Sequence, residues 1–498
     1  MLGVLDIQRV TIKHKVILAA FLLVGVFLIG SGRAHAATLN VSGSCPLEDA
    51  IMSVNNATDE NSCISTGTYG TNDTITIPAG TITLTADLPT ITESVSILGA
   101  GMGQTVVDGD GQYSGLSINM SEVDIHDLTV TGYADVAIDA QESNTVLENI
   151  EVDGQNATGV QFHVRFERNT AGTGTLNVNN LYIHNINATN YMGALYIIAG
   201  NSGEIDADLQ SVALGDIHNT GSGNITFGIF TGVGDEGSVN ANMVNISVDD
   251  VTGEDLVAPF VNMGFADDGD ASVTNSLQHL TITGVRGEVG TGLATGVDSA
   301  AFWVAGQAEA GNTSNIHISI GNSLLADNLS SGISNNCSEA NLNGLFGGSG
   351  TVENTITSLG HNISDDATCT SFTEDGDQQD VNNIISTLGP LQNNGGSVPT
   401  RALLAGSPAI SAGSAVLGIT ADARGVARPS TCPSVGAYQY EGAVCVASTT
   451  NGSGSSGGAG NLADTGQGAK TSIFVGILLV STAIATTLAR RRMVYKRR

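Results

Sequence analysis

The sequence predicts an all-β chain that folds as a single parallel β-helix, a solenoid in which each coil stacks on the preceding one. Three observations indicate this class. Val, Ile and Thr alternate with polar residues in short segments that end at Gly, Asn or Asp, as in half-buried strands. Similar segments recur along the chain. Lone polar residues such as Asn149, Asn180 and Asn245 stand beside them, as in turns and side-chain ladders of stacked coils.

The recurring segments set the expected size of the solenoid. Each is marked by one apolar residue, and successive markers lie 31, 22, 31, 31, 34 and 34 residues apart. The markers are Ile97, Leu128, Ile150, Leu181, Val212, Ile246 and Leu280. Such spacings suit coils with loops of variable length, and about ten coils stacked about 4.8 Å apart would form a rod of about 50 Å. The alternative, a row of β-sandwich domains, would show a longer, domain-sized repeat.

A short helix is expected to cap the first coil. Pro46 occupies the position that proline favours at the start of a helix. Apolar residues follow at positions 47, 50, 51 and 54, which form one helical face. A solenoid needs such a cover because its terminal coils would otherwise expose apolar side chains.

Charge separates the body of the chain from its two ends. Residues 37–469 carry 6 Arg, no Lys and 47 acidic residues, so their formal charge is 6 − 47 = −41. Binding to nucleic acid or anionic lipid is excluded, since both depend on Lys and Arg that neutralise phosphates. Polymers of uronic acids are excluded too, unless a cation bridges them.

Both ends of the chain carry targeting signals. Residues 1–36 combine basic residues, the apolar stretch 16–30 and a small-x-small motif, which is typical of a signal peptide cleaved between Ala36 and Ala37. An uncleaved membrane anchor is the alternative, although fifteen apolar residues are short for a span. At the other end, a Gly/Ser-rich linker over 448–461 precedes the peptide LADTG, an expected transmembrane helix over 472–489 and a basic, cytoplasmic tail.

Residues 462–498 resemble the cell-wall sorting signal of sortase substrates. The resemblance implies recognition of Leu462, Ala463, Thr465 and Gly466, attack by sortase on the carbonyl of the Thr465–Gly466 bond, and transfer to an amine of peptidoglycan or another wall component. Ala463 stands where the commonest pattern has Pro, which leaves the class of sortase open. The resemblance also implies a surface protein of a Gram-positive-type bacterium, held in the membrane only as a precursor.

Two parts of the body resemble known families of surface proteins. Residues 37–110, with the motif SCPLEDAIMSVNNA, resemble the CSLREA region of bacterial secreted proteins. Residues 351–447, with LGPLQNNGGSVPTRALLAGSPAISAG and ADARGVARP, resemble the choice-of-anchor Q domain. Together they imply a right-handed, pectin-lyase-like β-helix on the cell surface, without known catalytic residues. Residues 111–350 are assigned to further coils on their repeat pattern alone.

Six cysteines in an exported chain suggest disulfides. Proximity along the chain favours one of the fifteen possible connectivities, and free buried thiols are the alternative. The favoured pairs are Cys45–Cys63, Cys337–Cys369 and Cys432–Cys445.

No catalytic, cofactor-binding or metal residue is predicted. Glycosidases hold two carboxylates about 5–10 Å apart across a cleft, and the candidates are Asp249 with Asp250, Asp267 with Asp268 and Asp270, and Asp365 with Asp366. Neighbouring residues on a strand face opposite sides, so we expect solvated surface instead. Acidic turns at 108–110 and 374–377 are candidates for weak structural Ca²⁺ binding, but the loop from 108 lacks the twelfth-position Glu of an EF-hand.

We therefore expect a wall-anchored, adhesin-like or structural β-helix that binds a glycan or protein. The alternative is a wall-tethered glycosidase or lyase, which would need a groove lined by aromatic residues and a carboxylate pair. Trp303 is the one tryptophan of the chain, which counts against such a groove. A passive spacer is not distinguished from a binder by the sequence.

Overall fold

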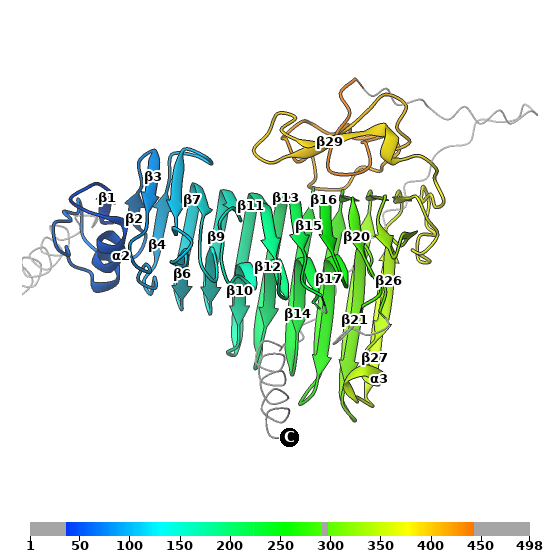
Figure 1. The fold of residues 1–498 in the computed structure, drawn as a ribbon, viewed down its shortest axis with the longest axis horizontal. Coiled ribbons are helices and arrows are strands. Elements are labelled where there is room, and N and C mark those ends of the chain that lie inside the picture. The colour runs from blue at the N-terminus through cyan, green and yellow to red at the C-terminus, as the bar shows by residue number, and fades with distance from the viewer. Residues whose placement is uncertain (1–35, 223, 291–296, 443–498) are drawn as a thin grey trace, which may run out of the picture.

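The fold is a parallel β solenoid with a folded-back C-terminal segment. The structure, a computed structural model, describes residues 36–222, 224–290 and 297–442. Two long parallel sheets run along the solenoid, and they are hereafter called the first and the second sheet (Figure 1). The prediction of a mostly β, parallel solenoid is confirmed.

The first sheet contains twenty strands of the described chain. They are β1 (Thr38–Asn40), β2 (Asp73–Thr76), β3 (Gly80–Thr83), β4 (Val95–Leu98), β5 (Thr105–Asp108), β7 (Glu122–Thr131), β9 (Asn144–Asp153), β11 (Gly172–Ala188), β13 (Gly203–Asn219), β15 (Gly237–Val244), β16 (Ser247–Gly253), β18 (Ala271–Gln278), β19 (Thr281–Thr283), β20 (Val285–Gly287), β22 (Thr313–Gly321), β23 (Leu324–Ala326), β24 (Leu329–Ser330), β25 (Ile333–Ser334), β27 (Thr351–Ser358) and β28 (Ile363–Ser364).

The second sheet contains eight strands, and a separate hairpin contains two more. The second sheet consists of β6 (Leu116–Asn119), β8 (Ile138–Gln141), β10 (Phe162–Arg168), β12 (Met192–Ala199), β14 (Thr226–Val233), β17 (Val257–Ala266), β21 (Phe302–Ala308) and β26 (Cys337–Asn341). The hairpin joins β29 (Leu388–Gln392) and β30 (Thr400–Leu403), and the short helices are α2 (Leu47–Asn56), α3 (Asn343–Phe346) and the 3-10 helix η2 (Ile385–Thr387).

The predicted helix at the N-terminal end is confirmed as α2. Pro46 is its N-cap, and Leu47, Ala50, Ile51 and Val54 are buried, as the helical periodicity predicts. The helix lies beside β1 at the end of the solenoid (Figure 1). The disulfide Cys45–Cys63 ties the start of the helix to the loop behind it.

Stacking of the coils can be followed at one position of the first sheet. Paired residues connect Thr38, Thr74, Ser96, Asp124, Val146, Asn177, Asp208, Asn242, Ser276, Ser319 and Thr357. Ten steps of about 4.8 Å give a length of about 50 Å, as predicted. One marker was wrong: Ile97 pairs with Ile125, not with Leu128, because β4 and β5 pair with different halves of β7.

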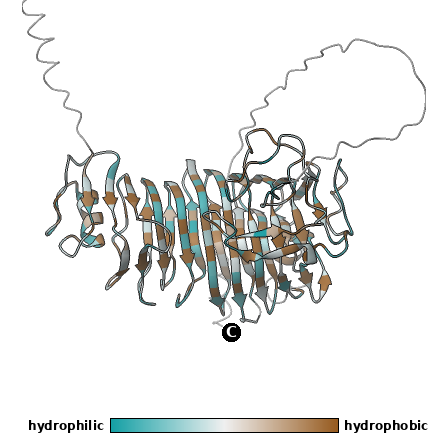
Figure 2. Ribbon diagram, turned by 90° about the horizontal axis from the view of Figure 1, so that it is seen from above, coloured by the Kyte–Doolittle hydropathy of each residue, from teal (hydrophilic) through white to brown (hydrophobic). Residues whose placement is uncertain are grey.

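Strand alternation builds the core. Residues at one parity of each strand point into the solenoid and form a continuous hydrophobic cluster, whereas residues at the other parity face outward. Figure 2 shows the result as hydrophobic and hydrophilic bands that alternate along the strands. Leu176, Ile205, Val239 and Val273 are inward examples, and each is at most 1 % exposed.

Eight successive coils of the first sheet bend at an equivalent residue with a left-handed backbone. The φ angles at these bends lie between 52° and 62°. This bend column contains Asp127, Asn149, Asn180, Ser211, Asn245, His279, Asn322 and His361. Its first members form the expected ladder, since Asn149 Nδ2 donates to Asp127 Oδ1 at 2.9 Å and Asn180 Nδ2 donates to Asn149 Oδ1 at 2.8 Å.

Residues 388–442, hereafter the C-terminal segment, fold back along the outside of the coils (Figure 1). They pack on the outward side of the first sheet beyond the bend column, where Ala213 contacts Val398, Ala423 and Ala437 in a small apolar cluster. Leu391 packs directly on Gly215: a Cβ added to Gly215 would lie 2.7 Å from Cδ2 of Leu391. The segment thus covers one outer face of the solenoid.

Arg428 fastens this segment to the bend column. Its guanidinium donates to Asn245 Oδ1 at 2.8 Å and to the carbonyl oxygens of Ser434 and Gly436 at 3.0 and 2.8 Å. Asn245 Nδ2 in turn donates to the Ala421 carbonyl oxygen. Burial lowers the pKa of Arg428 to about 10, so the side chain stays charged at neutral pH.

Among the described residues no helix is long and apolar enough to span a membrane. The predicted signal peptide and the predicted span over 472–489 lie outside the described residues, so both stay predictions.

Replacement of Arg428 should loosen the C-terminal segment. Arg428→Ala leaves Asn245 and two buried carbonyl groups without their donor, so we expect the free energy of unfolding to fall by about 2–4 kcal/mol. Urea denaturation measures this loss, and limited proteolysis should show earlier cleavage within 388–442. Arg168→Ala is the matched control, since Arg168 donates to the carbonyl oxygen of Gly172 in its own turn. Equal stability of the two variants would contradict the role of Arg428.

His279 should make the fold sensitive to acid. Burial, and secondarily the nearby Arg428, hold the pKa of His279 well below its ordinary value of 6.5. A group with a lowered folded pKa stabilises the fold above its unfolded pKa, and this stability is lost as pH falls below about 6.5. Asn is common in the bend column, so His279→Asn should fold. Between pH 7.5 and 5.5 its free energy of unfolding should fall by about 1 kcal/mol less than that of the parent protein. Identical pH dependence in denaturant titrations would refute this.

Candidate functional site

A shallow groove lies on the outward side of the first sheet, before the bend column. It has a volume of about 400 Å³. It is hereafter called the polar groove, and it is lined by Thr175, Asn177, Asp206, Ala207, Asp208, Asn240, Ala241, Asn242, Thr274, Asn275, Ser276 and Ser319. Most of these side chains end in hydroxyls, amides or carboxylates, so the groove offers hydrogen bonds, although carbon atoms make up most of its exposed lining.

Two straight rows of outward side chains form the groove. One row runs through Thr175, Asp206, Asn240 and Thr274, and the other through Asn177, Asp208, Asn242, Ser276 and Ser319. Neighbours within a row are about 4.8 Å apart along the solenoid, and the two rows are about 7 Å apart because they occupy every second residue of each strand. The rows therefore present a regular lattice of polar groups.

Hydrogen bonds inside the lattice leave several carboxylate and amide oxygens free to accept bonds from a ligand. Asn240 Nδ2 donates to Asp206 Oδ1, and Asn242 Nδ2 donates to Asp208 Oδ1, both at 3.2 Å. Each carboxylate keeps an oxygen with no bond inside the lattice, and each amide keeps its carbonyl oxygen. A ligand that donates hydrogen bonds or carries positive charge suits this surface.

Asp206 and Asp208 form a carboxylate pair that the sequence analysis missed. They lie two residues apart on β13, and therefore project from the same face of the sheet. Asp206 is exposed and Asp208 is half-buried. The alternation in EIDADLQ could have revealed the pair, since its Ile, Ala and Leu face inward.

Aromatic side chains gather elsewhere. Trp303 pairs with Val261 on the second sheet, and Tyr196 pairs with Phe230 in the same row. These four side chains belong to a second hydrophobic cluster and are at most 4 % exposed. No aromatic residue lines the polar groove.

The carboxylate pairs named from the sequence serve structural contacts. Asp249 forms an ion pair with Arg401 of the C-terminal segment at 3.0 Å, whereas Asp250 is a separate left-handed bend residue. Burial raises the pKa of Asp249, and Arg401 opposes this shift. Around 267–270, a loop tip as expected, the backbone N–H groups of Asp267 and Asp268 both donate to Asp235 Oδ1.

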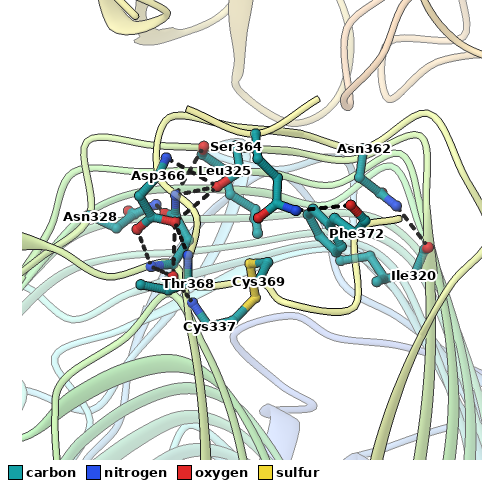
Figure 3. The surroundings of a disulfide bond; sticks show 12 residues. Ile320, Leu325, Asn328, Cys337, Asn362, Ser364, Asp366, Thr368, Cys369 and Phe372 are labelled. Carbon is teal, nitrogen blue, oxygen red and sulfur yellow. Dashed lines mark hydrogen bonds between the residues drawn. A yellow bond between two sulfur atoms is a disulfide. The ribbon is translucent and has the colours of Figure 1, made fainter. Parts of the chain in front are cut away.

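Asp365 and Asp366 bond to residues around the second disulfide, and Figure 3 shows Asp366 beside it. Asp366 accepts bonds from the backbone and side chain of Thr368 at 3.0 and 2.8 Å, and from the backbone N–H of Asn336 at 2.9 Å. Asp365 Oδ1 accepts from the side chain of the fully buried Asn336 at 2.8 Å. These bonds surround the Cys337–Cys369 disulfide, so this acidic pair stabilises the loop.

The acidic turns named for Ca²⁺ are also bonded within the protein. Asp108 Oδ1 accepts the backbone N–H of Asp110 at 2.9 Å, and Asp377 accepts from Ser358 and Asn362. One other group among the described residues has metal-ligand spacing. Asp216, His218 and Asp250 place their ligand atoms within 4.8 Å of one another at the coil surface.

Two of the three predicted disulfides are confirmed. Cys45 is bonded to Cys63 and Cys337 to Cys369. Cys445 lies outside the described residues, so its pairing with Cys432 stays a prediction, as do the sortase residues Leu462, Ala463, Thr465 and Gly466. At the expected signal-peptide junction, Ala36 bridges to Thr68 and Ala37 is fully buried.

Comparison with known proteins gives no further identification. No protein-family model matches the chain, and no curated protein or solved structure is similar to it.

Proposed function

We propose that the chain is a secreted surface protein that sortase attaches covalently to the cell wall at Thr465. Its right-handed, pectin-lyase-like β-helix serves as an adhesin-like or structural binding element in the manner of choice-of-anchor Q proteins. The disulfides favour an oxidising location outside the cytoplasm. The order of linker, LADTG, apolar segment and basic tail favours the wall anchor.

The polar groove carries the binding part of the proposal. It is an exposed, regular lattice on a rigid solenoid, and its carboxylates and free amide oxygens suit a glycan or protein that donates hydrogen bonds. The arginines of the body support a binding role over a lyase role. All six lie in the described part, and each donates to a protein acceptor.

A second candidate function is a wall-tethered glycosidase. Asp206 and Asp208 favour it, because two carboxylates on one face of a groove are the groups that glycoside hydrolysis needs. The lack of aromatic lining counts against it, since sugar rings commonly stack on aromatic side chains. Both functions place the ligand in the same groove, so one set of variants tests both.

Anchoring is tested by cell fractionation. Thr465→Ala removes the residue that would form the acyl-enzyme with sortase, so the protein should move from the wall fraction to the membrane fraction. Asp464→Asn is the matched control, because this position is variable in the sorting pattern and the variant should stay in the wall. A Thr465→Ala protein that is still linked to the wall would contradict the anchoring proposal.

Ligand binding is tested with groove variants. Asp206→Asn with Asp208→Asn should weaken binding to host cells, matrix proteins or glycans about tenfold or more, since it removes two charged acceptors. Asp267→Asn with Asp268→Asn makes the same charge change at a loop tip and should leave binding intact. Turnover of a polysaccharide panel by the parent, lost in the groove variant, would establish the glycosidase instead. No binding and no turnover by the parent would overturn both functions.

A further inference from the structure

One core position of the solenoid holds an acid without a counter-charge. Asp73 lies at an inward position of β2 and pairs with Val95, which in turn pairs with Val123. The two valines are at most 3 % exposed and Asp73 is 1 % exposed. A carboxylate in a column of core residues needs a compensating partner, because a buried charge that is not paired is costly.

The contacts of Asp73 point to the chain N-terminal to β1. Its Oδ1 accepts the backbone N–H of Ala37 at 2.8 Å, and its Oδ2 accepts the backbone N–H of Gly70 at 3.1 Å. No Lys, Arg or His of the described residues forms an ion pair with it. Both of its partners are neutral amides, and one is the nitrogen that would become the new N-terminus on signal-peptide cleavage.

Cleavage would change the chemistry of this nitrogen. Water adds across the Ala36–Ala37 bond, Ala36 leaves with the new carboxylate, and the amine of Ala37 takes up a proton to become an ammonium group. Ala37 is fully buried in the described fold, and its carbonyl oxygen accepts the N–H of Thr74 at 2.8 Å. These bonds hold the residue in place, so the ammonium would form beside Asp73.

We propose that Asp73 is the receptor for the N-terminus released by signal-peptide cleavage, and that the α-ammonium of Ala37 forms a buried ion pair with its carboxylate. Removal of the leader thereby supplies the missing counter-charge and completes the first coil. The bond from a neutral amide to a carboxylate becomes a bond between two opposite charges. This inference rests on the proposed secretion and cleavage, but the pairing can be tested apart from them.

The composition of the chain offers a selective probe. Residues 37–469 contain no lysine, so the α-amine of Ala37 is the one primary amine of the body. Lys470 and Lys496 near the C-terminus provide reference amines in the same molecule. An amine-reactive ester therefore reports on Ala37 directly when the labelled peptides are quantified by mass spectrometry.

The experiment uses the chain 37–498, released in detergent from a cleavable tag so that it begins at Ala37. Pairing with a carboxylate favours the unreactive ammonium form, so Ala37 should label about tenfold or more slowly than Lys496 in the folded protein. In urea Ala37 should label faster than Lys496, because an unpaired α-amine is less basic than a lysine amine and is therefore less protonated at neutral pH. Asp73→Asn should restore fast labelling in the folded protein, whereas Asp124→Asn, at a half-buried outward position of β7, should not. Fast labelling of Ala37 in the folded parent would overturn the proposal.

A second measurement does not depend on a variant that folds. Acetylation of the α-amine in the parent sequence removes the charge and should lower the melting temperature by several degrees. An unchanged melting temperature would overturn the proposal. N-terminal sequencing of the exported protein separately tests cleavage before Ala37. A different first residue would refute the proposed processing. The labelling result would still decide whether Asp73 can bind an N-terminus at Ala37.

Discussion

A left-handed backbone at an equivalent position of eight successive coils is the constraint on which the rest of this structure depends. Most residues avoid positive φ, and Asn, Asp and His tolerate it better than others, which explains the composition of the bend column. The bend fixes where the first sheet turns and therefore which residues of each strand face inward. Because strand parity cannot slip without turning the core outward, the bend column also sets the two outer faces beside it.

Of the two outer faces beside the bend column, one is exposed and the other is covered. On one side of the bend column the outward rows remain exposed and form the polar groove. On the other side the C-terminal segment covers the coils and bonds to the column through Arg428 and through Asn322, whose Oδ1 accepts the N–H of Ser414 at 2.7 Å. The segment does not extend the solenoid but packs on the outside of its coils. The groove and the segment share β13, which carries Asp206 and Asp208 before the bend column and Ala213 beyond it.

Much of the solenoid was predictable from the sequence, because its signals are local. Alternation, the recurring segments and the Asn ladder arise within one coil or between neighbouring coils, and the apolar face of α2 is contained in ten residues. The fold-back of the C-terminal segment was not predictable in this way. Its fastening joins Asn245 to Arg428, 183 residues apart, and no periodic pattern relates the two.

The candidate site was missed for a related reason. Most carboxylates that stand out in the sequence are adjacent in the chain, as Asp249 and Asp250 are, but the side chains of adjacent strand residues point to opposite faces. The groove instead uses residues two apart on a strand and residues 34 apart in register, as Asp208 and Asn242 are. Only the stacking of β13 on β15 brings these together, so the register had to be known first.

The charge of the body limits what the polar groove can recognise. The six arginines of the body form internal contacts, and Asn240 and Asn242 each donate one amide hydrogen to the carboxylates of Asp206 and Asp208. An anionic ligand would meet the repulsion of Asp206 and Asp208 and no arginine in the lining, whereas hydroxyls, amide N–H groups or ammonium groups would meet carboxylate and amide oxygens as acceptors. One row runs from Thr175 to Thr274 and the other from Asn177 to Ser319, so an extended ligand can contact several coils in turn. Affinity would then come from repetition of weak bonds, which suits a surface protein that holds a polymer rather than one that encloses a small molecule.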